Sequence, residues 1–141
     1  MRGKFITFEG GEGGGKSTQA ARMAGYLRGK GLEVLETREP GGTPESEALR
    51  DLLVQGDPDR WSALSELLLI TAARVEHVNR LIKPALTEGK WVICDRFADS
   101  SVAYQGYGHG LGADYIRNLW QLAIDGFKPD ITLIFDLPIE I

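Results

Sequence analysis

The chain has 141 residues, and its 16 lysines and arginines against 20 aspartates and glutamates give a net charge of −4. This balance excludes a typical duplex-DNA binder, which carries a clustered basic face, so no nucleic-acid partner is expected. The length fits one domain, and 43% hydrophobic with 26% charged residues is the composition of a globular chain with a core, not of a disordered one.

Three features predict a cytoplasmic protein without a membrane segment. The single cysteine, Cys94, has no partner for an internal disulfide, which fits a reducing compartment. The longest apolar run, residues 67–73, is far shorter than the ~20 residues that span a bilayer. The N-terminus lacks the apolar core of a signal peptide, because the acidic Glu9 comes too early.

Glycine clusters separate the elements that we expect in the first half of the chain. Residues 5–8 are β-branched or aromatic and predict a buried strand. Residues 17–30 place Ala20, Ala24 and Leu27 at helical spacing, and Gly31 ends this helix. Residues 33–37 predict a second strand, and residues 44–54 predict a helix with Pro44 in its first turn.

The second half continues the alternation of helices and strands. Residues 61–82 form the longest helical pattern, which we expect to end before Pro84. Residues 91–94 and 131–135 are apolar strands, and residues 114–124 form an amphipathic helix between them. Strands without polar alternation, separated by helices, predict the α/β class: a three-layer fold with a parallel β-sheet flanked by helices.

A glycine-rich loop follows the first strand and opens the first helix. Residues 10–17 match the phosphate-loop pattern G-x-x-x-x-G-K-[ST]. Glycines allow positive φ, so successive N–H groups can point at an anion, and the helix adds its positive dipole end. The predicted P-loop fold binds a nucleoside triphosphate, with Lys16 reaching the phosphates and Ser17 binding Mg²⁺. The site comprises Gly10, Gly11, Glu12, Gly13, Gly14, Gly15, Lys16, Ser17 and Thr18.

The rest of the sequence decides among classes of triphosphate-binding protein. A guanine-nucleotide switch would need an Asn-Lys-x-Asp base reader and an Asp-x-x-Gly turn, and the sequence contains neither. An ATPase places an acidic residue after a hydrophobic strand, but here Arg96 follows Asp95 directly, which is unlike a water-activating site. A kinase for a small phosphorylated acceptor needs basic and polar residues beside a phosphate loop. The remaining motifs fit that class.

A second motif begins where the strand 91–94 ends. Asp95 is expected to hold the Mg²⁺ with Ser17, and Arg96 to make a forked contact with a phosphate. Downstream, hydroxyl, phenol and amide groups are available to read a base and a sugar: Ser100, Ser101, Tyr104 and Gln105. Lys16, Arg96 and Glu12 are the candidate catalytic residues.

Taken together, the motifs resemble bacterial thymidylate kinase, a member of the P-loop nucleoside monophosphate kinases. The resemblance covers the whole chain, and its specific parts are the phosphate loop with Phe8-Glu9 before it and the stretches 37–43, 72–74, 95–97 and 103–106. It implies transfer of the γ-phosphoryl group of ATP to dTMP, with Mg²⁺, by a cytoplasmic homodimer. The substrate-binding residues that it implies are Glu9, Glu39, Pro40, Arg50, Ile70, Arg74, Arg96, Ser100, Ser101, Tyr104 and Gln105.

The resemblance also assigns roles within that set. Arg74 and Gln105 would face the thymine with Ser101 beside them, and Tyr104 would pack beside the sugar. Arg96, with Arg50 as a second candidate, would hold the acceptor phosphate. We also expect a strained or cis Glu39–Pro40 bond.

Two departures from the family pattern stand out. Many members place a thymine-stacking aromatic three or four positions before the matched arginine, where this chain has Thr71 and Ile70. The family also continues into a lid whose arginines cover the ATP phosphates, and the phosphate loop has Glu12 and no arginine to replace them. We therefore expect one domain over residues 1–141 that is incomplete at its C-terminal end, so that it binds substrates yet transfers phosphate poorly.

Alternative interpretations remain open from the sequence. A deoxynucleoside kinase shares the phosphate loop and the acidic-Arg motif, and a non-catalytic nucleotide-binding module would not need the lid. His77 and His109 are expected at the surface, and Cys94 as a packed small residue. The tryptophans are expected in the core or an interface, and the helix face around Trp120, with Leu119, Leu122 and Ala123, is a candidate dimer surface.

Overall fold

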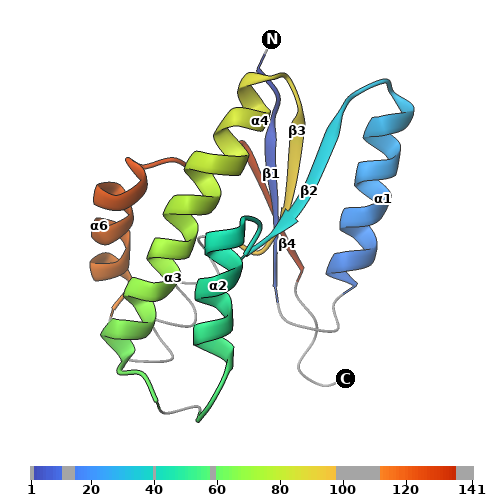
Figure 1. Cartoon of the computed structure of the whole chain (residues 1–141). Coiled ribbons are helices and arrows are strands. Elements are labelled where there is room, and N and C mark those ends of the chain that lie inside the picture. Colours follow the sequence, from blue (N-terminus) through green and yellow to red (C-terminus); the bar gives the residue numbers. More distant parts are fainter. Residues whose placement is uncertain (1, 11–14, 40, 58–59, 98–111, 136–141) are drawn as a thin grey trace.

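The centre of the fold is a parallel sheet in the computed structural model, which describes residues 2–10, 15–39, 41–57, 60–97 and 112–135 (Figure 1). Within these residues the strand order is β2-β3-β1-β4. The strands are β1 (Phe5–Gly10), β2 (Val34–Arg38), β3 (Trp91–Asp95) and β4 (Ile131–Phe135). All neighbouring pairs are parallel. The predicted α/β class and the predicted strands are confirmed, and β1 and β3 each run slightly further than their apolar runs.

The central strand β1 supplies side chains to both faces of the sheet. Phe5 packs in one core with the helices of the second half of the chain. Ile6 and Phe8 pack in the other core, beneath the first helix. This two-sided burial explains why the apolar residues Phe5, Ile6 and Phe8 do not alternate regularly with polar ones along β1.

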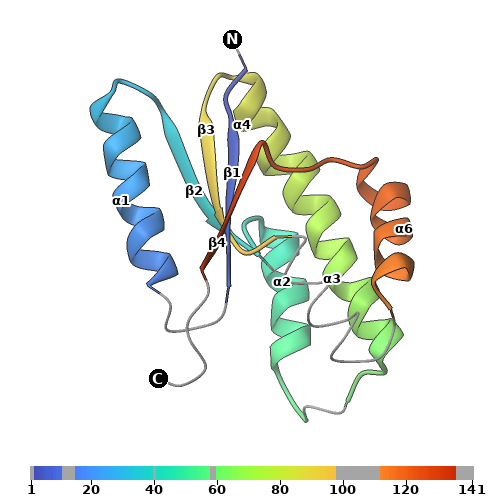
Figure 2. The ribbon, with the colours of Figure 1, turned by 180° about the vertical axis from the view of Figure 1, so that it is seen from behind.

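Helices cover both faces of the sheet, as the two opposite views show (Figures 1 and 2). Helix α1 (Lys16–Gly29) lies on one face and buries Ala20, Ala24 and Leu27. On the other face lie α3 (Ala63–His77), α4 (Lys83–Thr87) and α6 (Ala113–Ile124), and α2 (Pro44–Val54) packs on α3. The two cores give the three layers that the sequence predicts.

The long helix does not end before Pro84, so that prediction was wrong. A π-helical segment, η1 (Val78–Ile82), follows α3, and α4 then continues through Thr87. The N–H of Lys83 bonds to the carbonyl of Val78, five residues back. Pro84 lies in the first turn of α4, where its missing N–H is tolerated. The helical segment therefore continues through Pro84, because a π-helical turn precedes this proline.

Trp120 belongs to the core of this chain and not to an open helix face. It is 8% exposed, and Leu119 and Ala123 pack against the same core. Leu122 is 84% exposed. Trp120 therefore faces the core of this chain, and the predicted dimer surface around it stays a prediction. Cys94 is buried, and this burial raises the pKa of its thiol, as expected for a packed small residue.

Candidate functional site

The candidate site lies where β1 and β3 end. From β1 the chain crosses through α1 towards β2, whereas from β3 it crosses through α6 to β4 on the other side of β1. This reversal leaves a crevice outside the carboxyl ends of β1 and β3, the usual ligand position in an open parallel sheet. The end of the phosphate loop and the 95–97 segment meet there.

Lys16, Ser17 and Asp95 meet at this crevice. The Nζ atom of Lys16 lies 2.9 Å from Asp95 Oδ1, and the Ser17 hydroxyl lies 3.5 Å from Asp95 Oδ2. Lys16 is only 4% exposed, so Asp95 supplies the counter-charge that a buried ammonium requires. Gly15 begins α1 with a φ of 76°, a conformation that glycine adopts without strain. The structure thus brings together Lys16, Ser17 and Asp95 from the residues predicted for phosphate and metal binding.

The segment after Asp95 has an unusual backbone. Arg96 has a φ of 70°, a left-handed conformation that costs about 1–2 kcal/mol for a residue with a Cβ atom. Its N–H donates to the carbonyl of Phe8 at 2.8 Å. The next N–H, of Phe97, donates to the buried Glu9 carboxylate at 3.0 Å. The end of β1 therefore fixes the conformation of Arg96.

Arg74 holds the same segment from the opposite side. Its guanidinium, 2% exposed, donates to the carbonyl of Phe97 at 3.2 Å and lies over the rings of Phe97 and Trp120. Its Nε donates to Glu39 Oε1 at 2.6 Å. Arg74 was predicted to face a base; here it lies within a buried network.

His77 completes that network and is fully buried, with 0% exposure, so the predicted surface position was wrong. One ring nitrogen, Nδ1, lies 2.7 Å from Glu39 Oε2, and the other, Nε2, lies 2.7 Å from Thr37 Oγ1. Burial disfavours the Glu39 carboxylate, but Arg74 and His77 outweigh burial and hold the pKa of Glu39 below its usual range.

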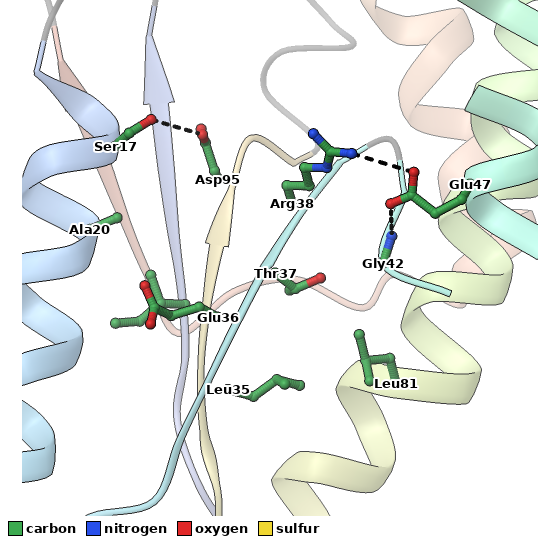
Figure 3. Close-up of a pocket in the computed structure, with 11 residues that line it drawn as sticks. Ser17, Ala20, Leu35, Glu36, Thr37, Arg38, Gly42, Glu47, Leu81 and Asp95 are labelled. Carbon is green, nitrogen blue, oxygen red and sulfur yellow. Dashed lines mark hydrogen bonds and ion pairs between the residues drawn. The ribbon is translucent and has the colours of Figure 1, made fainter. Parts of the chain in front are cut away.

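A cavity of about 510 Å³ opens beside the Ser17–Asp95 pair (Figure 3). An exposed ion pair also lines it, in which Arg38 Nη2 lies 3.4 Å from Glu47 Oε2, and Glu47 accepts the N–H of Gly42 at 3.1 Å. The lining residues are Ser17, Ala20, Leu35, Glu36, Thr37, Arg38, Gly42, Glu47, Leu81, Ile93 and Asp95.

Comparison with known proteins decides the family. The family model described as thymidylate kinase matches residues 8–141. The chain belongs to the thymidylate kinase family. It is 56% identical to a thymidylate kinase from Rhizorhabdus wittichii over 139 residues, covering 99% of this chain and 67% of that protein. It is 53% identical to a thymidylate kinase from Caulobacter vibrioides, with 99% and 67% covered. The chain therefore spans about two thirds of these relatives.

The fold of this member of the thymidylate kinase family is also similar to that of a solved structure. The crystal structure of thymidylate kinase from Ehrlichia chaffeensis is 48% identical and superposes with a TM-score of 0.89. The match covers 98% of this chain and 78% of that one. The predicted P-loop fold is thus confirmed.

Three further predicted site residues lie on described helices, and others fall outside the described residues. Thr18 is exposed on α1, while Arg50 on α2 and Ile70 on α3 are half-buried. The residues outside the described ranges are Gly11, Glu12, Gly13, Gly14, Pro40, Ser100, Ser101, Tyr104, Gln105 and His109. The expectation about the Glu39–Pro40 bond falls there too.

Sequence reasoning missed His77 as a partner of Glu39 and Thr37 as a partner of His77. One signal was available, because His77 follows Arg74 by three positions and so shares its helix face. Among the described residues there is no cluster of three or more His, Cys, Asp or Glu side chains for a metal ion. No helix in these ranges is long and apolar enough to span a membrane.

Proposed function

We propose that this chain transfers the γ-phosphoryl group of ATP to dTMP, giving ADP and dTDP. The observation that carries the proposal is the meeting of Lys16, Ser17 and Asp95 beside the fixed Arg96 at the ends of β1 and β3. The relatives' names support dTMP as the acceptor. Nothing in the comparisons favours a deoxynucleoside kinase or a non-catalytic module.

The donor half is formed by the phosphate loop and the start of α1. We propose that Lys16 exchanges its contact with Asp95 for the β- and γ-phosphates. The Ser17 hydroxyl and Asp95 carboxylate are oxygen donors 3.5 Å apart, a set that fits Mg²⁺. When bound, Mg²⁺ would neutralise charge on the phosphates.

The acceptor half is formed by the ends of β2 and β3 and by α3. We propose that Arg96 binds the phosphate of dTMP and that Glu9 and Glu39 border the nucleotide. Arg50, Ile70 and Arg74 stay proposed contacts, together with Pro40, Ser100, Ser101, Tyr104 and Gln105. Glu12 stays a proposed catalytic residue of the loop.

Phosphoryl transfer requires the protein to position the two substrates more than to form covalent bonds with them. The acceptor phosphate is already an anion, so no strong general base is required. The protein must hold donor and acceptor in line, neutralise charge and keep water out. Lys16 and Arg96 supply positive charge from the two sides of the crevice.

The deciding experiment titrates the folded chain with dTMP and with thymidine, following the heat of binding. We expect saturable dTMP binding and much weaker thymidine binding, because thymidine lacks the phosphate that Arg96 would hold. ADP release from ATP should depend on dTMP. A preference for thymidine would favour a deoxynucleoside kinase, and triphosphate binding without either acceptor would indicate a non-catalytic module.

We further propose a cytoplasmic homodimer, as the family resemblance implies. Exposed apolar side chains on two helices support an interface: Leu64 and Leu68 on α3, and Tyr115 and Leu122 on α6. Sedimentation velocity at several concentrations tests the dimer. A single monomer species throughout would contradict it.

A further inference from the structure

A chain of buried contacts connects His77 to the backbone of Arg96. His77 bonds to one oxygen of Glu39, and Arg74 bonds to the other. Arg74 also bonds to the carbonyl of Phe97, whose N–H is held by Glu9. Both peptide groups of Phe97 are therefore fixed, directly after the left-handed Arg96.

His77 connects this series of buried contacts to β2 and to the segment that follows it. Its second ring nitrogen bonds to Thr37 on β2, and it is the last residue of α3 before the π-helical segment. Gly42 packs so closely on the ring that a Cβ atom there would lie 2.5 Å from it. The imidazole is thus held in one orientation from β2, from the β2–α2 connection and from its own helix.

Resting on the proposed function, we propose that His77 is a positioning residue of the dTMP site. It fixes the Glu39 carboxylate, Glu39 fixes Arg74, and Arg74 with Glu9 keeps Arg96 in its left-handed conformation. His77 itself is buried and contacts no substrate. Loss of its bond to Glu39 should therefore weaken the acceptor site while leaving the donor site unchanged.

Two substitutions separate the two bonds of the imidazole. In His77→Asn the amide can replace Nδ1 and keep the Glu39 contact, whereas in His77→Gln it can replace Nε2 and keep only the Thr37 contact. We expect His77→Gln to weaken dTMP binding about tenfold, and His77→Asn to weaken it markedly less. ATP affinity should change little in both variants. Equal loss of dTMP binding in both, or a parallel loss of ATP binding, would overturn the inference.

A measurement on the native chain covers the case in which a variant does not fold. The ring signals of His77 should be protected from exchange and should shift in NMR spectra when dTMP saturates the site. An unchanged His77 signal at saturation would overturn the inference while leaving the proposed function intact. A folded native chain that does not bind dTMP at all would overturn both.

Discussion

At the scale of single residues, the Lys16–Asp95 pair determines the electrostatics of the candidate site. Removing a buried ammonium from water is unfavourable unless an anion compensates it. Asp95 does so at 2.9 Å, and a phosphate could take over that role because Lys16 lies at the end of the phosphate loop. The pair therefore holds the Lys16 side chain in place at the crevice.

Replacing Lys16 with alanine removes this charge from the donor side alone. We expect Lys16→Ala to lower the rate of phosphoryl transfer by at least about 100-fold, because it removes a group that stabilises transition-state charge. Calorimetric dTMP binding should survive. Lys30→Ala, which removes an exposed lysine at the other end of α1, is the matched control and should retain the native rate. Loss of dTMP binding by folded Lys16→Ala would show that donor and acceptor halves are not separable.

At the scale of elements, the connection from β2 to α2 depends on glycine. Gly41 and Gly42 have φ values of 138° and 99°, where side chains are strained. Thr43 then caps α2, its Oγ1 accepting the N–H of Ser46 at 3.1 Å, and Pro44 follows in the first turn. The chain can thus turn sharply beside His77 and begin a helix at once.

Two glycine-to-alanine substitutions test this assignment. We expect Gly42→Ala to lower the free energy of unfolding by about 2 kcal/mol or more, because its Cβ would collide with the His77 ring at an unfavourable φ. Gly25→Ala, in open space within α1, should raise it by about 0.5–1 kcal/mol. Urea unfolding of both variants measures the contrast, and similar effects would contradict the proposed packing.

The start of β4 is joined to the start of β1 through Asp130. The N–H of Phe5 donates to Asp130 Oδ2 at 2.8 Å, and the N–H of Asp130 donates to the carbonyl of Phe5 at 2.8 Å. The Phe5 N–H, aided by Arg2, lowers the pKa of Asp130 below its ordinary value of 3.8. A lowered pKa contributes stability above the unfolded-state value, and this stability is lost as the pH falls through the folded-state value.

The Asp130→Asn substitution should therefore make the free energy of unfolding depend less on pH at acidic pH. We expect the native chain to lose more unfolding free energy than the variant between about pH 6 and about pH 3, because only the native chain must protonate this carboxyl. Urea titrations across that range give the difference. Parallel profiles would show that the Phe5 contact does not perturb the carboxyl in solution.

At the scale of the whole molecule, the candidate site draws on both sides of the sheet. Lys16 and Ser17 belong to α1 on one face, while Arg74 and His77 belong to α3 on the other. The two cores lie on opposite faces of the sheet, and β1 contributes to each. A nucleotide bound at the crevice therefore contacts segments that come apart when the chain unfolds.

Binding of dTMP should stabilise the whole fold by mass action. At a concentration of about 100 times its Kd, a ligand that binds only the folded state adds about 2.7 kcal/mol to the free energy of unfolding. We expect dTMP to raise the melting temperature and thymidine at the same concentration to raise it much less. Equal shifts with both would show that the phosphate is not recognised.

Local patterns in the sequence were enough to predict most elements and the chemistry of the phosphate loop. Apolar runs and helical spacing are local, so they predicted every described strand and the parallel sheet. The glycine-lysine-serine pattern is likewise local, and Lys16, Ser17 and Asp95 do meet. The end of the long helix was placed wrongly, because a proline is compatible with a helix when a π turn precedes it.

Which polar residues become buried hydrogen-bond partners depends on how the elements pack in three dimensions. In the sequence His77 has an ordinary helix position, and no local signal shows that Thr37 on β2 and Glu39 just after β2 will bond to its ring. The left-handed Arg96 is similarly imposed by Glu9 and Arg74, which are far away in the chain. A buried polar group needs a hydrogen bond, because its desolvation would otherwise go uncompensated. The partner comes from whichever element packs beside it, and the periodicity of the sequence carries no information about that neighbour.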